Sequence, residues 1–283
     1  MVSQDLDQAR KANAFQALHQ RQRGFVIPNP WDAGTARILS ALAYEALATT
    51  SAGLAFALGR RDSERAVTRE ETLANAAAIV SATDLPVSAD LENGYSDSPG
   101  PVAQTIRLAA EAGLVGASIE DASGGRYVPI YDFDHAVERV AAAAEAARSL
   151  PFPFCLTARA ENFLHGRPDL DDTIRRLQAF AAVGADVLYA PGLPSLEAIR
   201  LVCTSVEQPV NVVMGLGAWY SVETLADAGV KRISLGAALS RAALGGFLKA
   251  AREIKERGTF SFIEGTPSFA EVSNYMAPGI AHD

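Results

Sequence analysis

The stretch Leu85-Pro-Val-Ser-Ala-Asp-Leu-Glu-Asn-Gly94 decides how this chain of 283 residues is interpreted. Its apolar first half is typical of a buried parallel strand, and Asp90 and Glu92 come where that strand should end. Asn93 and Gly94 then turn the chain. Acidic side chains at the carboxyl end of a strand are poor core material and good ligands for a hard cation such as Mg2+.

A second stretch further along the chain repeats this arrangement. Leu114-Val-Gly-Ala-Ser-Ile-Glu-Asp121 is an apolar run that ends in Glu120 and Asp121. Because the carboxyl ends of neighbouring parallel strands lie at one edge of the sheet, the two acidic pairs should approach each other. We therefore predict that these strand ends meet around one magnesium-like ion.

Apolar runs and helical patterns alternate along the whole chain, which calls for a parallel sheet. Strands are predicted over 24–29, 44–51, 85–90, 114–119, 154–159, 186–191, 209–214 and 230–236. Repeated units of this kind predict an α/β fold, a closed (β/α)8 TIM-type barrel. An open dinucleotide-binding sheet is disfavoured because no Gly-x-Gly-x-x-Gly follows the first strand. We assign 1–283 to a single barrel domain with an N-terminal helix over about 5–23 and a C-terminal helical tail over about 237–283.

Composition narrows the class of function. The chain is 20% charged and 49% hydrophobic, with a formal net charge of −8, which argues against nucleic-acid and anionic membrane partners. Cys155 and Cys203 have no metal-ligand spacing and are expected to be buried thiols in a reducing compartment. The first residues lack the basic and apolar regions of a signal peptide, and no apolar run could span a bilayer. We expect a soluble, cytoplasmic protein.

In a barrel of this type the active site lies at the carboxyl ends of the strands. Crowded carboxylates there either raise their pKa values or bind a divalent cation. Arg159 could hold a substrate carboxylate through two hydrogen bonds, and the Ser51–Gly53 turn offers backbone N–H groups and a hydroxyl. The candidate residues at the predicted strand ends are Trp31, Ser51, Ala52, Gly53, Asp90, Glu92, Glu120, Asp121, Arg159 and Asn211.

Each candidate also has a structural alternative. A single acidic residue at a strand end is often only a solvated cap. Arg159 could simply neutralise Glu161 or Glu120, and Trp31 could belong to the core. His135 and His165 are not spaced as metal ligands and are expected at the surface.

Four motifs, in this order, resemble the signature of the isocitrate lyase/phosphoenolpyruvate mutase superfamily. They are Thr49-Thr-Ser-Ala-Gly53, the Asp90-x-Glu92-x-Gly94-Tyr95 turn, Ser118-Ile-Glu-Asp121 and Ala158-Arg159. The resemblance implies a (β/α)8 barrel whose eighth helix is swapped between subunits of a homodimer or homotetramer. It also implies that Asp90 holds Mg2+ (or Mn2+) directly, and that Glu92 and Glu120 hold it mainly through waters.

The resemblance further implies a substrate class. Members bind small anionic 2-oxo acids or enolates, with the Ser51–Gly53 turn and Arg159 holding the oxygens and the metal stabilising an enolate. Asp62 falls where the family carries an acidic residue near the reacting centre.

The chain departs from the lyase pattern at three places. Isocitrate and methylisocitrate lyases carry Lys-Lys-Cys-Gly-His after the fourth strand, where this chain has Ser123-Gly-Gly-Arg-Tyr-Val-Pro129. It also has Ala190-Pro191 and Asn211-Val-Val-Met in place of a glutamate and an Asn-x-Thr-Glu run. The Lys-bearing gating loop of the mutases is missing too. Arg126 and Tyr127 are candidates to close over the substrate, although a plain flexible loop fits equally well.

We predict a Mg2+-dependent carbon–carbon lyase or decarboxylase that acts on a small 2-oxo or 2-hydroxy carboxylate, including dicarboxylates, through a metal-stabilised enolate. The first alternative is a mutase or hydrolase of the P–C bond of phosphonopyruvate. The second is a non-catalytic barrel that binds a 2-oxo acid.

Overall fold

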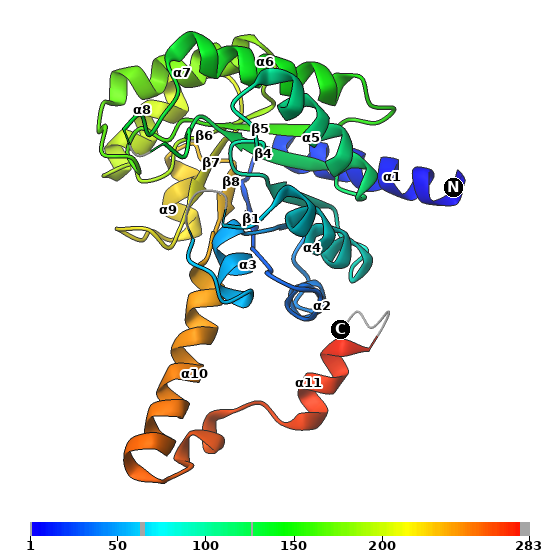
Figure 1. The fold of residues 1–283 in the computed structure, drawn as a ribbon, viewed down its shortest axis with the longest axis vertical. Coiled ribbons are helices and arrows are strands. Elements are labelled where there is room, and N and C mark those ends of the chain that lie inside the picture. The colour runs from blue at the N-terminus through cyan, green and yellow to red at the C-terminus, as the bar shows by residue number, and fades with distance from the viewer. Residues whose placement is uncertain (1, 63–65, 126, 278–283) are drawn as a thin grey trace.

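The computed structural model describes residues 2–62, 66–125 and 127–277. Within these residues, eight parallel strands alternate with helices around a nearly closed barrel (Figure 1). The order in the sheet is β1-β8-β7-β6-β5-β4-β3-β2, and the Ala48 N–H donates to the Pro28 carbonyl at 3.0 Å across the remaining gap. The predicted (β/α)8 TIM-type fold is confirmed. The strands are β1 Phe25–Ile27, β2 Leu47–Ala48, β3 Val87–Asp90, β4 Gly116–Glu120, β5 Cys155–Arg159, β6 Val187–Tyr189, β7 Val210–Val213 and β8 Arg232–Ser234.

The helices follow the capping signals of the sequence. Thr68 caps α4 and forms a capping box with Glu71, and Asp169 caps α7 by accepting from the Asp172 N–H. The outer helices are α2 Ala33–Ala41, α3 Ser51–Ala57, α4 Arg69–Ser81, α5 Pro99–Glu111, α6 Phe133–Arg148, α7 Leu170–Ala182, α8 Leu196–Ser205 and α9 Val222–Asp227.

The predicted second strand is too long. β2 covers only Leu47–Ala48, and the expected turn at Ser51–Gly53 is the first turn of helix α3. The Thr50 hydroxyl accepts from the Gly53 N–H at 3.2 Å, so this threonine caps the helix instead of ending the strand.

Helix α1 (Val2–Gln20) closes the end of the barrel at which the strands begin. Its Phe15 and Leu18 are buried in one apolar cluster with Phe25 of β1 and Cys155 of β5. Since α1 seals this floor, the carboxyl ends of the strands form the open face of the barrel.

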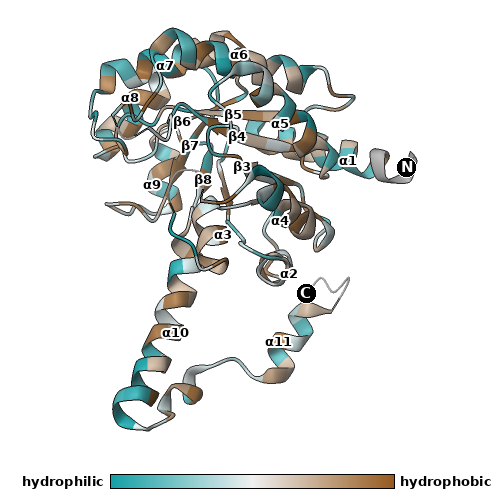
Figure 2. Ribbon diagram, viewed as in Figure 1, coloured by the Kyte–Doolittle hydropathy of each residue, from teal (hydrophilic) through white to brown (hydrophobic). Residues whose placement is uncertain are grey.

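The C-terminal segment leaves the barrel. Helix α10 (Ala238–Arg257) extends away from it, and η1 (Ser261–Gly265) and α11 (Phe269–Met276) lead back towards α2 (Figure 1). Figure 2 shows apolar positions along α10 far from the barrel, and Phe247 is 68% exposed. Exchange of this helix between subunits stays a prediction. Among the described residues, no helix has the length and apolar character needed to cross a membrane.

Candidate functional site

Asp90, the last residue of β3, lies at the mouth of the barrel. Its carboxylate accepts from the Ser51 hydroxyl at 2.8 Å and from Nη1 of Arg159 at 3.0 Å. Its backbone N–H donates to the Thr49 hydroxyl at 3.0 Å. Three of the four motifs noted in the sequence therefore meet here through direct hydrogen bonds.

Arg159, at the end of β5, joins three carboxylates. Its guanidinium lies 3.0 Å from Asp90, 3.1 Å from Glu120 and 2.8 Å from Glu161, and it packs 5.0 Å from the centre of the Tyr189 ring. Arg159 therefore does neutralise Glu120 and Glu161, as the structural alternative to a substrate-binding role proposed. A substrate carboxylate would have to take the place of some of these contacts.

Glu92 and Glu120 are held in an environment that disfavours their charged forms. Burial, with repulsion from Asp90 and Asp62, raises the pKa of Glu92 to about 7. Burial also raises the pKa of Glu120, and Arg159 opposes this only in part. The backbone of Glu92 is left-handed, with φ of +48°, a conformation that non-glycine residues rarely adopt. A strained, electrostatically unfavourable carboxyl group at a strand end is typical of a functional position.

An acidic outer cavity of about 340 Å³ opens above these groups. It is lined by Ser51, Asp62, Glu92, Glu120, Arg159, Glu161 and His165, among others. The structure therefore places Asp62 beside the other acidic residues, and burial together with the charge of Asp90 raises its pKa. His165 is half-buried on the wall of this cavity.

Asp121 does not join the site as the sequence predicted. It is buried 3.0 Å from Arg176 of α7 and accepts from the Glu161 N–H at 2.8 Å. Burial raises its pKa to about 6 despite these partners. Successive strand residues point to opposite faces, so Glu120 faces the barrel mouth while Asp121 faces the helices.

The residues expected to hold substrate are divided between three places. Trp31 and Gly53 line a separate cavity of about 230 Å³ with residues of α3 and α10. Ser51 instead contacts Asp90, and Ala52, which lies between Ser51 and Gly53 in the sequence, is half-buried. The Gly53 N–H is already bonded within the cap of α3. Tyr127 is 90% exposed and does not line the acidic cavity, and Arg126 lies outside the described residues.

A smaller inner cavity of about 60 Å³ lies inside the barrel. Asp90 and Arg159 line it, as do Asn211 of β7 and Arg232 of β8. The Asn211 side-chain oxygen accepts from Nε of Arg232 at 2.8 Å, and its amide nitrogen donates to the Ser234 hydroxyl at 3.0 Å. Of the predicted substrate-binding residues, Asn211 is thus placed at the centre of the barrel.

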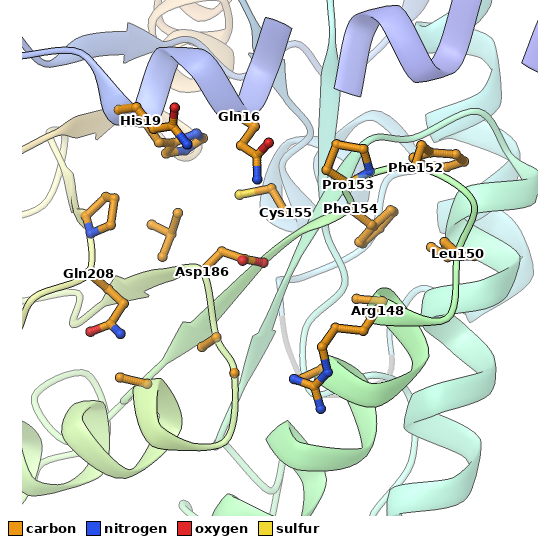
Figure 3. A pocket seen from close by; sticks show the side chains of 18 of the residues that line it. Gln16, His19, Arg148, Leu150, Phe152, Pro153, Phe154, Cys155, Asp186 and Gln208 are labelled. Carbon is orange, nitrogen blue, oxygen red and sulfur yellow. The ribbon is translucent and has the colours of Figure 1, made fainter. Parts of the chain in front are cut away.

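A larger cavity of about 760 Å³ lies at the opposite end, under α1 (Figure 3). Gln16 and His19 face it from α1, and Cys155 and Asp186 face it from the starts of β5 and β6. Asp186 already accepts from the Leu156 N–H at 2.8 Å. Because this cavity is at the floor, it shares none of the clustered carboxylates of the barrel mouth.

The carboxylates of the barrel mouth, Asp90 together with Glu92 and Glu120, suit a divalent cation by chemistry, although not as a preformed cage. Among the described residues, no three His, Cys, Asp or Glu side chains are arranged to hold a metal ion together. Mg2+ takes one or two carboxylates and keeps several waters, so Asp90 with Glu92 or Glu120 is a sufficient donor set. A cation there would also relieve the repulsion that raises the pKa of Glu92.

Several residues of the site were not selected from the sequence. Tyr189 and Ser118 are inward-facing strand residues that contact Arg159 and Asp90, respectively. Strand periodicity could have identified both. Arg232 follows Lys231 in what looks like an exposed basic pair, and only the register of β8 turns it inwards.

Comparison with known proteins gives a consistent picture. The family model described as phosphoenolpyruvate phosphomutase matches residues 15–255. A solved structure from Burkholderia cenocepacia J2315, provisionally assigned as a lyase or mutase, has a TM-score of 0.94 and 58% identity and covers 96% of this chain and 98% of its own. An uncharacterized Mycobacterium tuberculosis protein is 30% identical, covering 86% of this chain and 89% of its own. The 2-methylisocitrate lyase of Escherichia coli is 26% identical, with 70% and 67% covered.

Proposed function

Because the chain belongs to the phosphoenolpyruvate phosphomutase family, within the isocitrate lyase/phosphoenolpyruvate mutase superfamily, we propose that it is a Mg2+-dependent carbon–carbon lyase or decarboxylase. Its substrate would be a small 2-oxo or 2-hydroxy carboxylate. One observation carries the proposal: Asp90, Glu92 and Glu120 converge with Arg159 at the strand ends, in surroundings that disfavour the charged forms of both glutamates.

Asp90 would bind the ion directly, with Glu92 and Glu120 reaching it mainly through waters. The ion would supply positive charge for the oxygen on which negative charge develops as the C–C bond breaks. The hydrogen bond from Ser51 to Asp90 at 2.8 Å holds the carboxylate in place for this role.

Arg159 would hold the substrate carboxylate. Its guanidinium is buried and already has three anionic partners, which raises its pKa further. It therefore stays charged at every working pH and can exchange one carboxylate for another without changing its protonation state. Asp62, on the wall of the outer cavity, would lie near the reacting carbon.

Turnover of a small panel of substrates tests the proposal. The protein with Mg2+ should release pyruvate or a related 2-oxo acid from oxaloacetate or from substituted malates, measured with a coupled dehydrogenase. The Asp90→Asn variant is the control for uncatalysed, metal-driven decarboxylation. Turnover of phosphonopyruvate alone would replace the proposal by P–C bond chemistry. Metal-dependent binding of oxalate without turnover of any substrate would indicate a binding protein.

We also propose that α10 is exchanged between two copies of the chain. The helix leaves the barrel with Phe247 68% and Leu248 47% exposed, an apolar surface that a second barrel would cover. A homodimer or homotetramer would follow, and its mass in solution is the test.

A further inference from the structure

The inner cavity contains a buried positive charge that lacks a negative partner. Arg232 is only 5% exposed, and no ion pair reaches it from the described part of the chain. An arginine stays protonated in proteins, so its charge remains even though burial lowers its pKa. A buried unpaired charge costs several kcal/mol, and it is retained only where something compensates for it.

Among the described residues, the three side chains that form hydrogen bonds with Arg232 are neutral. Nε donates to the Asn211 oxygen at 2.8 Å and Nη2 donates to the Thr157 hydroxyl at 2.8 Å. Nη1 lies 3.4 Å from Nε2 of His19, whose Nδ1 is 2.8 Å from the Phe15 carbonyl. Because Nδ1 must donate to that carbonyl, Nε2 carries the lone pair and accepts from the arginine.

The titratable groups that interact electrostatically with Arg232 are also uncharged. Burial lowers the pKa of His19 to about 3 and raises the pKa of Cys155 to about 12. Burial raises the pKa of Tyr189 as well. Of the five N–H bonds of the guanidinium, these contacts use three, so two remain for a ligand.

The two cavities of the barrel mouth therefore differ in charge. The outer cavity has four carboxyl groups, those of Asp62, Glu92, Glu120 and Glu161, and shares one guanidinium, that of Arg159. The inner cavity has the guanidinium groups of Arg159 and Arg232 against the single carboxylate of Asp90. The other polar groups of its lining are neutral hydroxyl and amide groups, among them those of Ser88, Ser118, Asn211 and Ser234.

We propose that the inner cavity is a carboxylate subsite in which Arg232 selects ligands that carry a second negative group. About 60 Å³ is room for a carboxylate and not for a longer chain. The proposal deepens the proposed function, since it rests on a 2-oxo acid at Asp90 and Arg159 and adds that the substrate is a dianion. Arg232 is then a binding residue for the second carboxylate, and Thr157 and His19 position it.

Two unreactive ligands of similar size test this, malonate with two carboxylates and propionate with one. Their affinities for the intact protein with Mg2+ are measured by titration calorimetry. The wild type should bind malonate at least about tenfold more tightly than propionate, because the second carboxylate accepts charge-assisted hydrogen bonds from buried Arg232. Arg232→Met should remove that preference. A malonate-to-propionate ratio that Arg232→Met leaves unchanged would overturn the proposal.

Two further variants distinguish the effect of the Arg232 charge from the effect of its hydrogen bonds on the fold. Thr157→Val removes a hydrogen bond but keeps the cation, so the ligand preference should persist within about twofold. Asn211→Asp places a carboxylate 2.8 Å from Nε in nearly the same volume, so it should raise the melting temperature and lower the preference for malonate. A lower melting temperature with an intact preference would contradict the proposal even if Arg232→Met failed to fold.

The effect of Arg232 on the malonate-to-propionate affinity ratio can be measured separately from the contribution of the metal site. Asp90→Asn should weaken the metal-dependent binding of both ligands alike and leave their ratio dependent on Arg232. Loss of Mg2+ dependence in the wild type would refute the proposed function alone, whereas a ratio insensitive to Arg232 would refute the subsite alone.

Discussion

Replacing Glu92 by Gln should stabilise the metal-free protein at alkaline pH. The pKa of Glu92 is raised from 4.5 to about 7 by burial and by repulsion from Asp90 and Asp62. At pH values between these two pKa values, Glu92 is protonated in the folded state and ionised in the unfolded state. The carboxyl group therefore costs stability as pH rises through this window and has no such cost below about pH 4.5.

The size of the effect follows from the shift. At about 1.4 kcal/mol per pKa unit, the full shift corresponds to about 3 kcal/mol at pH 8. Roughly half should be measurable, because the side chain is only partly buried and solvent screens the repulsion. For a chain of 283 residues, about 2 kcal/mol raises the melting temperature by about 3 °C.

The assay is thermal unfolding in EDTA, followed by circular dichroism at pH 5 and pH 8. Glu92→Gln should melt above the wild type at pH 8 and close to it at pH 5. Glu71→Gln is the matched control of opposite sign, because Arg60 and the cap of α4 lower the pKa of Glu71 to about 2. That control should melt below the wild type at pH 8. If Glu92→Gln melts at or below the wild type at pH 8, the electrostatic description of the site is wrong.

Three further predictions concern stability and assembly. Thr68→Ala removes the cap of α4 and should lower stability by about 1 kcal/mol, measured by urea unfolding, and an unchanged midpoint would show that the cap contributes nothing. Arg176→Met strips buried Asp121 of its partner at 3.0 Å and should cost about 3–5 kcal/mol. The double variant with Asp121→Asn should recover part of that loss, and no recovery would contradict the pairing. If α10 is exchanged between subunits as proposed, Phe247→Asp on α10 should give monomers in light scattering, whereas a mass equal to that of the wild type would argue against helix exchange.

Much of the barrel could be predicted from local signals. Apolar runs identified all eight strands of the described chain, and Thr68 and Asp169 are residues of the type that caps a helix at the starts of α4 and α7. The start of α3 was missed because Thr50 and Ser51 suit both a strand end and a helix cap. The local sequence pattern cannot distinguish a strand end from a helix cap here, because the result depends on whether the Thr50 hydroxyl accepts a hydrogen bond from the Gly53 N–H.

The residues of the site could be predicted only from the rule that the carboxyl ends of parallel strands lie at one edge of the sheet. That rule brought Asp90, Glu120 and Arg159 together. It failed for Asp121, where the alternation of strand faces decides, and for Arg232. Lys231 reaches the exposed Arg21 and Gln22 carbonyls while Arg232 turns inwards, a difference that one residue of register creates.

The central claim is that Asp90 binds a divalent cation which in turn recruits a 2-oxo acid. Calorimetric titration of oxalate into the wild type and Asp90→Asn, each with and without Mg2+, tests it most directly. We expect oxalate to bind the wild type only when Mg2+ is present and to lose about a hundredfold or more in affinity in Asp90→Asn. Oxalate binding that is equally tight without Mg2+, or that survives the loss of the Asp90 carboxylate, would contradict the account.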